Sequence, residues 1–302
     1  MIIVWGPLDD APVATVLDAL TERATDVVHL DDRALDAVRY EVTIGPAVAG
    51  WIEVGGRQID LEEIDGIYLR PGEQRGAAQT TSATLLAVAG AMQATVVNRP
   101  AAGRSNLSKP FQLALIRAAG IATPDTLVTS DPIAAKAFLA RHGRIVYKSI
   151  SGQRSIVNAI DATEPERLDR VGHGPVQLQQ WIDGLDVRVH VVGDRWFATS
   201  VTSPATDYRY APEDGSSVEL APFDVPEQLG KDLVGMSSDM GLLVAGIDLR
   251  RTYDAGWFCF EVNPSPGFTY YEDHTGQPIA AAIAELLTAH DRRTGRNAAA
   301  AG

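Results

Sequence analysis

Ala245-Gly246-Ile247-Asp248-Leu249-Arg250 and Trp257-Phe258-Cys259-Phe260-Glu261-Val262-Asn263 are the two segments that decide how the chain is interpreted. Their apolar residues, interrupted by single charged ones, predict two strands joined by a short turn. Glu261 and Asn263 are two residues apart and therefore project from the same face of their strand. If the hairpin closes, Asp248 lies within cross-strand reach of both, and three oxygen ligands converge on one point.

Oxygen ligands without histidine or cysteine suit magnesium, which keeps several waters and takes its remaining ligands from nucleotide phosphates. The alternative is that Asp248 and Glu261 simply point outward into solvent, and the two segments alone leave both interpretations open. The turn Pro264-Ser265-Pro266-Gly267 favours a site. A rigid turn directly after the carboxylates can orient backbone N–H groups toward an oxyanion.

Two lysines form a second feature. Lys109 opens an expected helix, and Lys148 follows the apolar run Ile145-Val146-Tyr147. A single lysine is most often a solvated surface charge. Lys148, however, precedes residues 149–155, a loop of small residues whose backbone is able to fold over phosphates. The loop contains one glycine, Gly152, so by itself it is a weak signal.

Composition restricts the classes of function. The 302 residues are 45% apolar and 22% charged, as in ordinary globular proteins, and carry a formal net charge of -13. This balance argues against nucleic-acid binding, because phosphate binding requires a positive footprint. The single cysteine, Cys259, is expected to be a small buried hydrophobe. Residues 1–8 lack the pattern of a signal peptide and no stretch reaches transmembrane length, so we expect a cytoplasmic protein without membrane contact.

The order of expected elements predicts an α/β start and an α+β C-terminal region. Strands at residues 1–5 and 27–30 flank an amphipathic helix, which is typical of a parallel sheet. Hairpins are expected around Gly55-Gly56 and Gly193-Asp194. Residues 204–222 are expected to form a polar connection.

The arrangement resembles the ATP-grasp superfamily, most closely the branch of microviridin-type peptide ligases and glutamate-adding ligases. Tyr68-Leu69-Arg70-Pro71 is similar to a segment of the family's N-terminal domain. The other motifs follow in the family's order: Asn98-Arg99-Pro100, Ser108-Lys109-Pro110-Phe111-Gln112-Leu113, Thr126-Leu127-Val128-Thr129, Tyr147-Lys148, Asp207-Tyr208-Arg209 and Glu261-Val262-Asn263-Pro264. Each motif alone is weak, and their colinear order is what makes the resemblance specific.

The resemblance implies a three-domain ATP-grasp fold of mixed α/β and α+β class, with ATP between the central and C-terminal domains. We expect an N-terminal α/β domain over residues 1–100 and a central subdomain over residues 101–183. The C-terminal subdomain, with the metal site, would span residues 184–291 and end in a helix at 278–290. Residues 292–302 would be a frayed tail.

The resemblance also implies roles for individual residues. The phosphates of ATP would be held by Lys109, Lys148, Ser151 and Gly152. Adenine would pair with the backbone of a hinge formed by Gln179, Gln180, Trp181 and Ile182, and the ribose would meet Asp186. The γ-phosphate or acyl phosphate would be contacted by Arg188 and Arg209. The N–H of Gly267 would help to bind the developing oxyanion. Mg²⁺ would be bound by Asp248, Glu261 and Asn263.

Three departures from the family pattern bear on function. The phosphate loop has one glycine where many relatives have several, so lid closure could differ or Arg154 could compensate by its charge. Gln180 stands where relatives often carry glutamate, which keeps an acceptor but removes a charge. Residues 264–267 resemble the glutamate-adding group, whereas residues 269–282 resemble the peptide-ligase group, and this leaves the substrate open.

The expected reaction is ATP- and Mg²⁺-dependent activation of a carboxylate as an acyl phosphate, followed by attack of an amine or hydroxyl. The first hypothesis is modification of a ribosomally made peptide, and a ligase joining free amino acids is its nearest rival. A non-catalytic ATP-binding regulator is the alternative from another class. No catalytic triad is apparent, and His173 and His190 are expected to be structural. A homodimer is expected from the resemblance alone.

Overall fold

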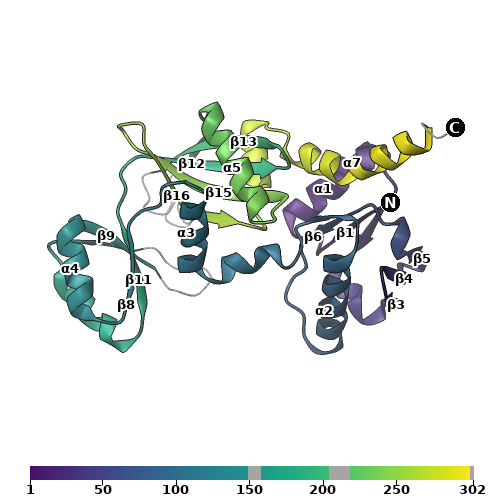
Figure 1. Ribbon diagram of the computed structural model, residues 1–302, viewed down its shortest axis with the longest axis horizontal. Helices are drawn as coiled ribbons and strands as arrows, with labels where there is room; N and C mark the ends of the chain where they lie inside the picture. Colours follow the sequence, from purple (N-terminus) through teal and green to yellow (C-terminus); the bar gives the residue numbers. More distant parts are fainter. Residues whose placement is uncertain (149–157, 204–217, 300–302) are drawn as a thin grey trace.

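The structure, a computed structural model, describes residues 1–148, 158–203 and 218–299 (Figure 1). Its N-terminal body contains four parallel strands in the order β2-β1-β6-β7. These strands are β1 (Ile2–Trp5), β2 (Val27–Leu30), β6 (Gly66–Leu69) and β7 (Thr95–Val97). Helix α1 (Ala11–Glu22) connects β1 to β2, which confirms the predicted strand, helix and strand. All residues of β1 and β6 are buried, as expected for parallel strands covered on both faces.

One face of this sheet packs against α2 (Gly76–Ala91) and a small antiparallel sheet. The small sheet consists of β3 (Arg39–Ile44), β4 (Val48–Val54) and β5 (Arg57–Asp60). The turn between β4 and β5 lies at Gly55-Gly56, where the sequence predicted a hairpin. Two short 3-10 helices, η1 (Asp32–Ala37) and η2 (Leu61–Glu63), complete this side.

The opposite face packs against α1 and against α7 (Ile279–Ala299), which lies beside α1 although the two are at opposite ends of the chain (Figure 1). The approach of α7 is close at Gly66, where a Cβ atom would lie 2.8 Å from the carbonyl oxygen of Leu287. Helix α7 continues beyond residue 290, where the sequence analysis ended it, into the expected tail. No helix in the described part of the chain is long and apolar enough to cross a membrane.

The central part is a four-stranded antiparallel sheet in the order β10-β9-β11-β8. Its strands are β8 (Thr126–Thr129), β9 (Arg144–Lys148), β10 (Asn158–Asp161) and β11 (Val176–Gln180). Helix α4 (Pro132–His142) and the 3-10 helix η4 (Pro165–His173) cover one face. The Asp131 side chain caps α4 by accepting from the Ile133 N–H at 2.9 Å, and Pro132 occupies the first turn.

The C-terminal part is a five-stranded antiparallel sheet in the order β14-β13-β12-β15-β16. Its strands are β12 (Leu185–Val192), β13 (Arg195–Thr202), β14 (Glu219–Pro222), β15 (Val244–Arg251) and β16 (Trp257–Asn263). The predicted hairpin at Gly193-Asp194 joins β12 and β13. Residues 204–222 were expected to form a polar connection, and this was wrong for Glu219–Pro222, which form β14.

Helices α3 (Lys109–Ala118) and α5 (Glu227–Asp239) cover one face of the C-terminal sheet and enclose an apolar core. Short helices follow β7 and β16, namely η3 (Ala102–Leu107) and α6 (Thr269–Thr275). Asn98 ties the N-terminal body to this sheet. Its amide donates to the carbonyls of Val244 and Pro264, both at 2.6 Å, and accepts from the N–H groups of Leu243 and Val244.

Candidate active site

The predicted pairing of carboxylates is present. In the β15–β16 ladder Asp248 lies directly opposite Glu261, and Asn263 lies opposite Gly246. Side chains directly opposite on neighbouring strands have Cβ atoms roughly 5 Å apart. The Asp248 and Glu261 side chains therefore meet on the face of the sheet away from α3 and α5, with Asn263 next to them.

A β-bulge directly beside this pair sets which residues share the face. Leu249 pairs with Cys259 while Asp248 pairs with Glu261, so Phe260 is the extra residue. Cys259 and Val262 are both fully buried in the core on the helix side, although they are three residues apart. A regular strand cannot place both in that core while keeping Glu261 on the opposite face, and the bulge removes the conflict. Cys259 is thus the small buried hydrophobe that the sequence predicted, and its burial raises the pKa of the thiol.

Gln112 of α3 fixes the edge strand β16 between the two ligand candidates. Its amide nitrogen donates to the Val262 carbonyl at 2.7 Å, and its amide oxygen accepts from the Val262 N–H at 3.0 Å. Gln112 is 3% exposed. An edge strand otherwise leaves such peptide groups unpaired. The two hydrogen bonds therefore fix both peptide groups of Val262, the residue between Glu261 and Asn263, in one orientation.

The turn after β16 is held from both sides. The Asn263 side-chain oxygen accepts from the Ser265 N–H at 2.9 Å. Arg70 of the N-terminal body donates to the Ser265 hydroxyl at 2.9 Å and to the Pro266 carbonyl at 3.0 Å. Gly267 ends this turn in an exposed position. The rigidity expected of the turn thus comes from specific hydrogen bonds as well as from its prolines.

Arg188 joins the carboxylates from the neighbouring strand. It pairs with Asp248 across the β12–β15 ladder, and its Nη1 donates to the Asp248 Oδ1 at 2.6 Å. The Arg188 side chain is 7% exposed and that of Asp248 is 25% exposed. Arg188 therefore neutralises part of the charge of Asp248, the carboxylate that faces Glu261.

The donor set fits a hard cation better than a soft one. In the described ranges no group of three or more His, Cys, Asp and Glu side chains could hold a metal ion. The candidate set is two carboxylates and one amide, Asp248, Glu261 and Asn263, all contributing oxygen. Magnesium uses few protein carboxylates together with water and phosphate oxygens, so this chemistry fits it.

Lys148 brings the central sheet to the same place. Its Nζ donates to the Gln179 side-chain oxygen at 2.9 Å and lies 5.6 Å from the ring centroid of Phe260, the bulge residue next to Glu261. Gln179 is 1% exposed and also donates to the Thr126 hydroxyl at 3.2 Å. The Gln179 side chain thus holds the lysine in position. Lys109 is the first residue of α3, the helix that carries Gln112.

The expected hinge begins in the last two residues of β11, Gln179 and Gln180, and is fixed by the central sheet. The N–H groups of Gln180 and Trp181 donate to the carbonyls of Asp125 at 2.8 Å and Arg144 at 3.2 Å. The Gln180 side-chain oxygen accepts from the Asp125 N–H at 3.3 Å. A glutamate would supply the same acceptor, so this contact is compatible with either residue. Adenine contacts of the hinge stay a prediction.

Arg250 fixes the other side of the hinge, and the sequence analysis missed it. Its guanidinium donates to the Ile182 carbonyl at 2.8 Å and makes three hydrogen bonds of 2.6–2.8 Å to the Asp186 carboxylate. It also lies 5.7 Å from the Trp181 ring centroid and 5.4 Å from that of Phe260. Asp186, expected to bind ribose, is therefore already paired, although a carboxylate keeps further acceptor capacity.

Other expected site residues lie outside the described residues, namely Ser151, Gly152 and Arg209, as does Arg154.

The structure also shows supporting residues that sequence reasoning did not select. His190 was expected to be structural, and Tyr271 and Gly246 were not singled out, yet all three contact Arg188 or its surroundings. The available signal for His190 was its spacing, two residues from Arg188 on one strand.

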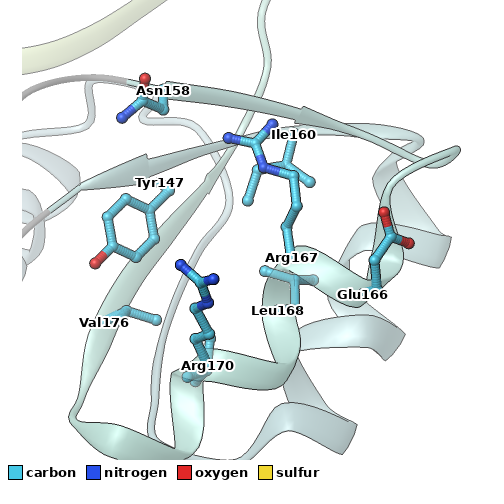
Figure 2. Close-up of a pocket in the computed structure, with 9 residues that line it drawn as sticks. Tyr147, Asn158, Ile160, Glu166, Arg167, Leu168, Arg170 and Val176 are labelled. Atoms are coloured by element: carbon cyan, nitrogen blue, oxygen red, sulfur yellow. The ribbon is translucent and has the colours of Figure 1, made fainter.

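A cavity of about 440 Å³ lies elsewhere, on the helix-covered face of the central sheet (Figure 2). Its floor includes Ile160, Leu168 and Val176, which belong to the core beneath α4 and η4. Tyr147 points into it. The adjacent Lys148 lies on the opposite face of β9, near Phe260. This cavity is therefore distinct from the candidate active site.

The chain is similar to known ligases. Residues 107–287 match the model of the RimK-like ATP-grasp domain. A probable alpha-L-glutamate ligase of Vibrio cholerae serotype O1 is 27% identical over 286 residues, covering 90% of this chain and 89% of that protein. A probable alpha-L-glutamate ligase 2 of Shewanella amazonensis is 34% identical over 116 residues, and the aligned part spans 38% of its length and 37% of this chain.

A solved structure gives the same fold. The ATP-grasp ligase PsnB, complexed with a phosphomimetic variant of a minimal precursor, Mg and ADP, superposes with a TM-score of 0.81 and 25% identity over 96% of this chain and 98% of that chain. The ATP-grasp fold of mixed helix and sheet content that was expected from the resemblance is thereby confirmed. The family match covers the central sheet, the C-terminal sheet and every candidate ligand described above, and the chain belongs to the RimK-like ATP-grasp family.

Proposed function

We propose that the protein is an ATP- and Mg²⁺-dependent ligase that joins a carboxylate to an amine or hydroxyl through an acyl phosphate. One observation carries the proposal: Asp248 and Glu261 lie directly opposite each other, beside Lys148 and Arg188. Like charges directly opposite each other on neighbouring strands destabilise a sheet. Their juxtaposition is explained if both carboxylates would hold a cation in the working enzyme.

The binding roles follow from charge and position. Lys148 and Lys109 would bind ATP phosphates, and the hinge from Gln179 to Ile182 would hold adenine. Asp248, Glu261 and Asn263 would hold Mg²⁺, which when bound neutralises phosphate charge and orients the triphosphate. Ser151, Gly152 and Arg209 are proposed for phosphate contacts and Asp186 for the ribose, by resemblance.

The reaction would proceed in two balanced steps. A substrate carboxylate oxygen attacks the γ-phosphorus, the bond to the bridging oxygen breaks, and ADP leaves. The acceptor amine or hydroxyl then attacks the acyl carbon, loses its proton, and displaces inorganic phosphate. Arg188 would stabilise the charge on the transferred phosphoryl group, and the N–H of Gly267 the charge on the acyl oxygen. No covalent residue of the protein is required, because positioning and charge neutralisation supply most of the catalysis.

For the substrate class we propose a ribosomally made peptide. PsnB, which matches along 96% of this chain, was solved with a precursor peptide. The rival, a ligase acting on free amino acids, is supported by the glutamate ligase names of the sequence relatives. A non-catalytic ATP-binding regulator is the alternative from another class. A binder could tolerate loss of the metal ligands, whereas Asp248 and Glu261 are both present and aligned.

The substrate is tested by incubating the protein with ATP and magnesium and one of two pools: free amino acids, or short acidic peptides encoded beside its gene. ADP and a peptide product lighter by one water support the peptide ligase. ADP and a product only in the amino-acid pool support the rival. Tight ATP binding with no ADP in either pool supports the regulator and contradicts ligation.

A further inference from the structure

We propose that His190, Tyr271 and Gly246 form a buried support that holds the guanidinium of Arg188 on Asp248 and thereby positions this arginine for phosphoryl transfer. The inference rests on the proposed function, because it assigns Arg188 to the transferred phosphoryl group. The three supporting residues would be positioning residues, acting through Arg188.

The first contact comes from the same strand. Arg188 and His190 are two residues apart on β12 and therefore share a face. The Arg188 Nε donates to the His190 Nε2 at 3.4 Å, while the Arg188 Nη1 donates to Asp248 at 2.6 Å. His190 is fully buried. The guanidinium is thus held at two separate nitrogens, which fixes its plane.

An aromatic ring from a distant helix provides the second contact. The Tyr271 ring of α6 lies edge-on to the His190 ring, with centroids 4.9 Å apart, and its centroid lies 5.8 Å from the Arg188 Cζ. Tyr271 is 8% exposed. A cation near an aromatic ring is stabilised by the ring, and more strongly when water is excluded. Helix α6 therefore contributes directly to the environment of the arginine.

Glycine at position 246 leaves the space that Arg188 occupies. A Cβ atom there would lie 2.1 Å from the Arg188 Nη2 and 2.6 Å from the Cβ of Pro266. Because Gly246 lies opposite His190 in the β12–β15 ladder, any side chain on this face would displace the guanidinium. The absence of a side chain at this position is part of the support.

His190 must be neutral to accept from a guanidinium. Burial, and then the adjacent Arg188 charge, lower its pKa well below the usual value. With Nε2 as acceptor, the proton lies on Nδ1, which is buried and faces the Gly267 backbone without a well-formed hydrogen bond. A neutral acceptor holds the guanidinium without adding a further charge beside it.

The experiment compares His190→Phe, which keeps a ring against Tyr271 but removes the acceptor, with His190→Gln, which retains an acceptor near the Nε2 position. The matched control is Val189→Ala on the same strand, whose fully buried side chain faces the opposite core. The kcat and the KM for ATP are measured by ADP release with the substrate that the two-pool assay identifies. The free energy of unfolding is measured by urea denaturation.

We expect kcat of His190→Phe to fall about ten- to a hundredfold with little change in the KM for ATP, since small misplacements of a catalytic group cost that much. His190→Gln should recover most of the loss. Val189→Ala should lose stability but keep kcat. Equal losses in the phenylalanine and glutamine variants, or a wild-type kcat in His190→Phe, would overturn the proposal.

Crystal structures of the same variants separate this inference from the proposed function, because they need no turnover. The Arg188 guanidinium should leave Asp248 in His190→Phe and stay on it in His190→Gln. An unmoved guanidinium in His190→Phe overturns the support even if the wild type is an active ligase. A moved guanidinium upholds the support even if the wild type releases no ADP, in which case only the proposed function fails.

Discussion

Replacing Gln112 by methionine removes the support of β16 at nearly constant side-chain volume. The change leaves the N–H and the carbonyl of Val262 without their partners at 3.0 and 2.7 Å. Val262 is fully buried. An unsatisfied buried polar group costs about 1–3 kcal/mol, so two such groups should lower the free energy of unfolding by about 2–6 kcal/mol.

The same change should weaken magnesium binding, because the affected peptide lies between Glu261 and Asn263. We expect the magnesium concentration for half-maximal ADP release to rise about tenfold, which corresponds to about 1.4 kcal/mol. Urea unfolding measures the stability and a magnesium titration of ADP release measures the second effect. The control is Gln228→Met, an exposed glutamine on α5 that donates to Asp232.

Gln228→Met should be neutral in both assays. The reasoning about Gln112 is refuted if Gln112→Met loses less than about 1 kcal/mol of stability and keeps the wild-type magnesium dependence. Loss of stability with unchanged magnesium dependence would limit Gln112 to a role in folding.

Three further predictions follow from single contacts. As pH falls from 7.5 to 5.5, His190 becomes protonated in the unfolded chain, with a pKa near 6.5, but stays neutral in the folded protein, where its pKa is lowered. The free energy of unfolding should therefore fall by about 1.4 kcal/mol over this range. Urea unfolding at both pH values should show that the acid-induced loss of stability is smaller in His190→Gln than in the wild type by about 1.4 kcal/mol. Arg250→Met should weaken ATP binding about tenfold by calorimetry, since the hinge carbonyl and Asp186 lose their partner. Gly66→Ala should lower the free energy of unfolding by about 1–3 kcal/mol, because α7 leaves no space for a methyl group.

For each of these three predictions, one result would contradict the reasoning. An unchanged acid-induced loss of stability in His190→Gln would show that His190 takes up protons in the folded protein as it does in the unfolded chain. Wild-type ATP affinity in Arg250→Met would separate Arg250 from the nucleotide site. Gly235→Ala on α5, where a Cβ atom meets nothing within 4 Å, is the control for Gly66→Ala and should be neutral or stabilising. Equal effects of the two alanine variants would contradict the packing of α7.

The β15–β16 hairpin was predictable because its turn and alternation are local. The sequence placed Asp248 within reach of Glu261, and the ladder confirms that they are directly opposite. The bulge at Phe260 was not predictable, since it results from burying Cys259 and Val262 in one core. Periodicity along a single strand contains no such information.

The supports around the site were less accessible to sequence reasoning. Gln112 and Val262 are 150 positions apart, and Asp186 and Arg250 are 64 apart. Their partners are decided by which strands become neighbours, and a polar residue alone does not reveal whether it faces solvent or a backbone group. Strands β8, β10 and β14 were missed as strands because each is four residues long and largely unburied.

The most direct test of the central claim is ADP release by the wild type and by Glu261→Gln with the same substrate over a range of magnesium concentrations. The substitution removes one ligand charge at nearly constant volume, and Glu219→Gln on exposed β14 is the matched control. The account predicts magnesium-dependent turnover in the wild type and the control, and its loss in Glu261→Gln without unfolding. Near-wild-type turnover of Glu261→Gln would contradict the assignment of Asp248, Glu261 and Asn263 as the magnesium site.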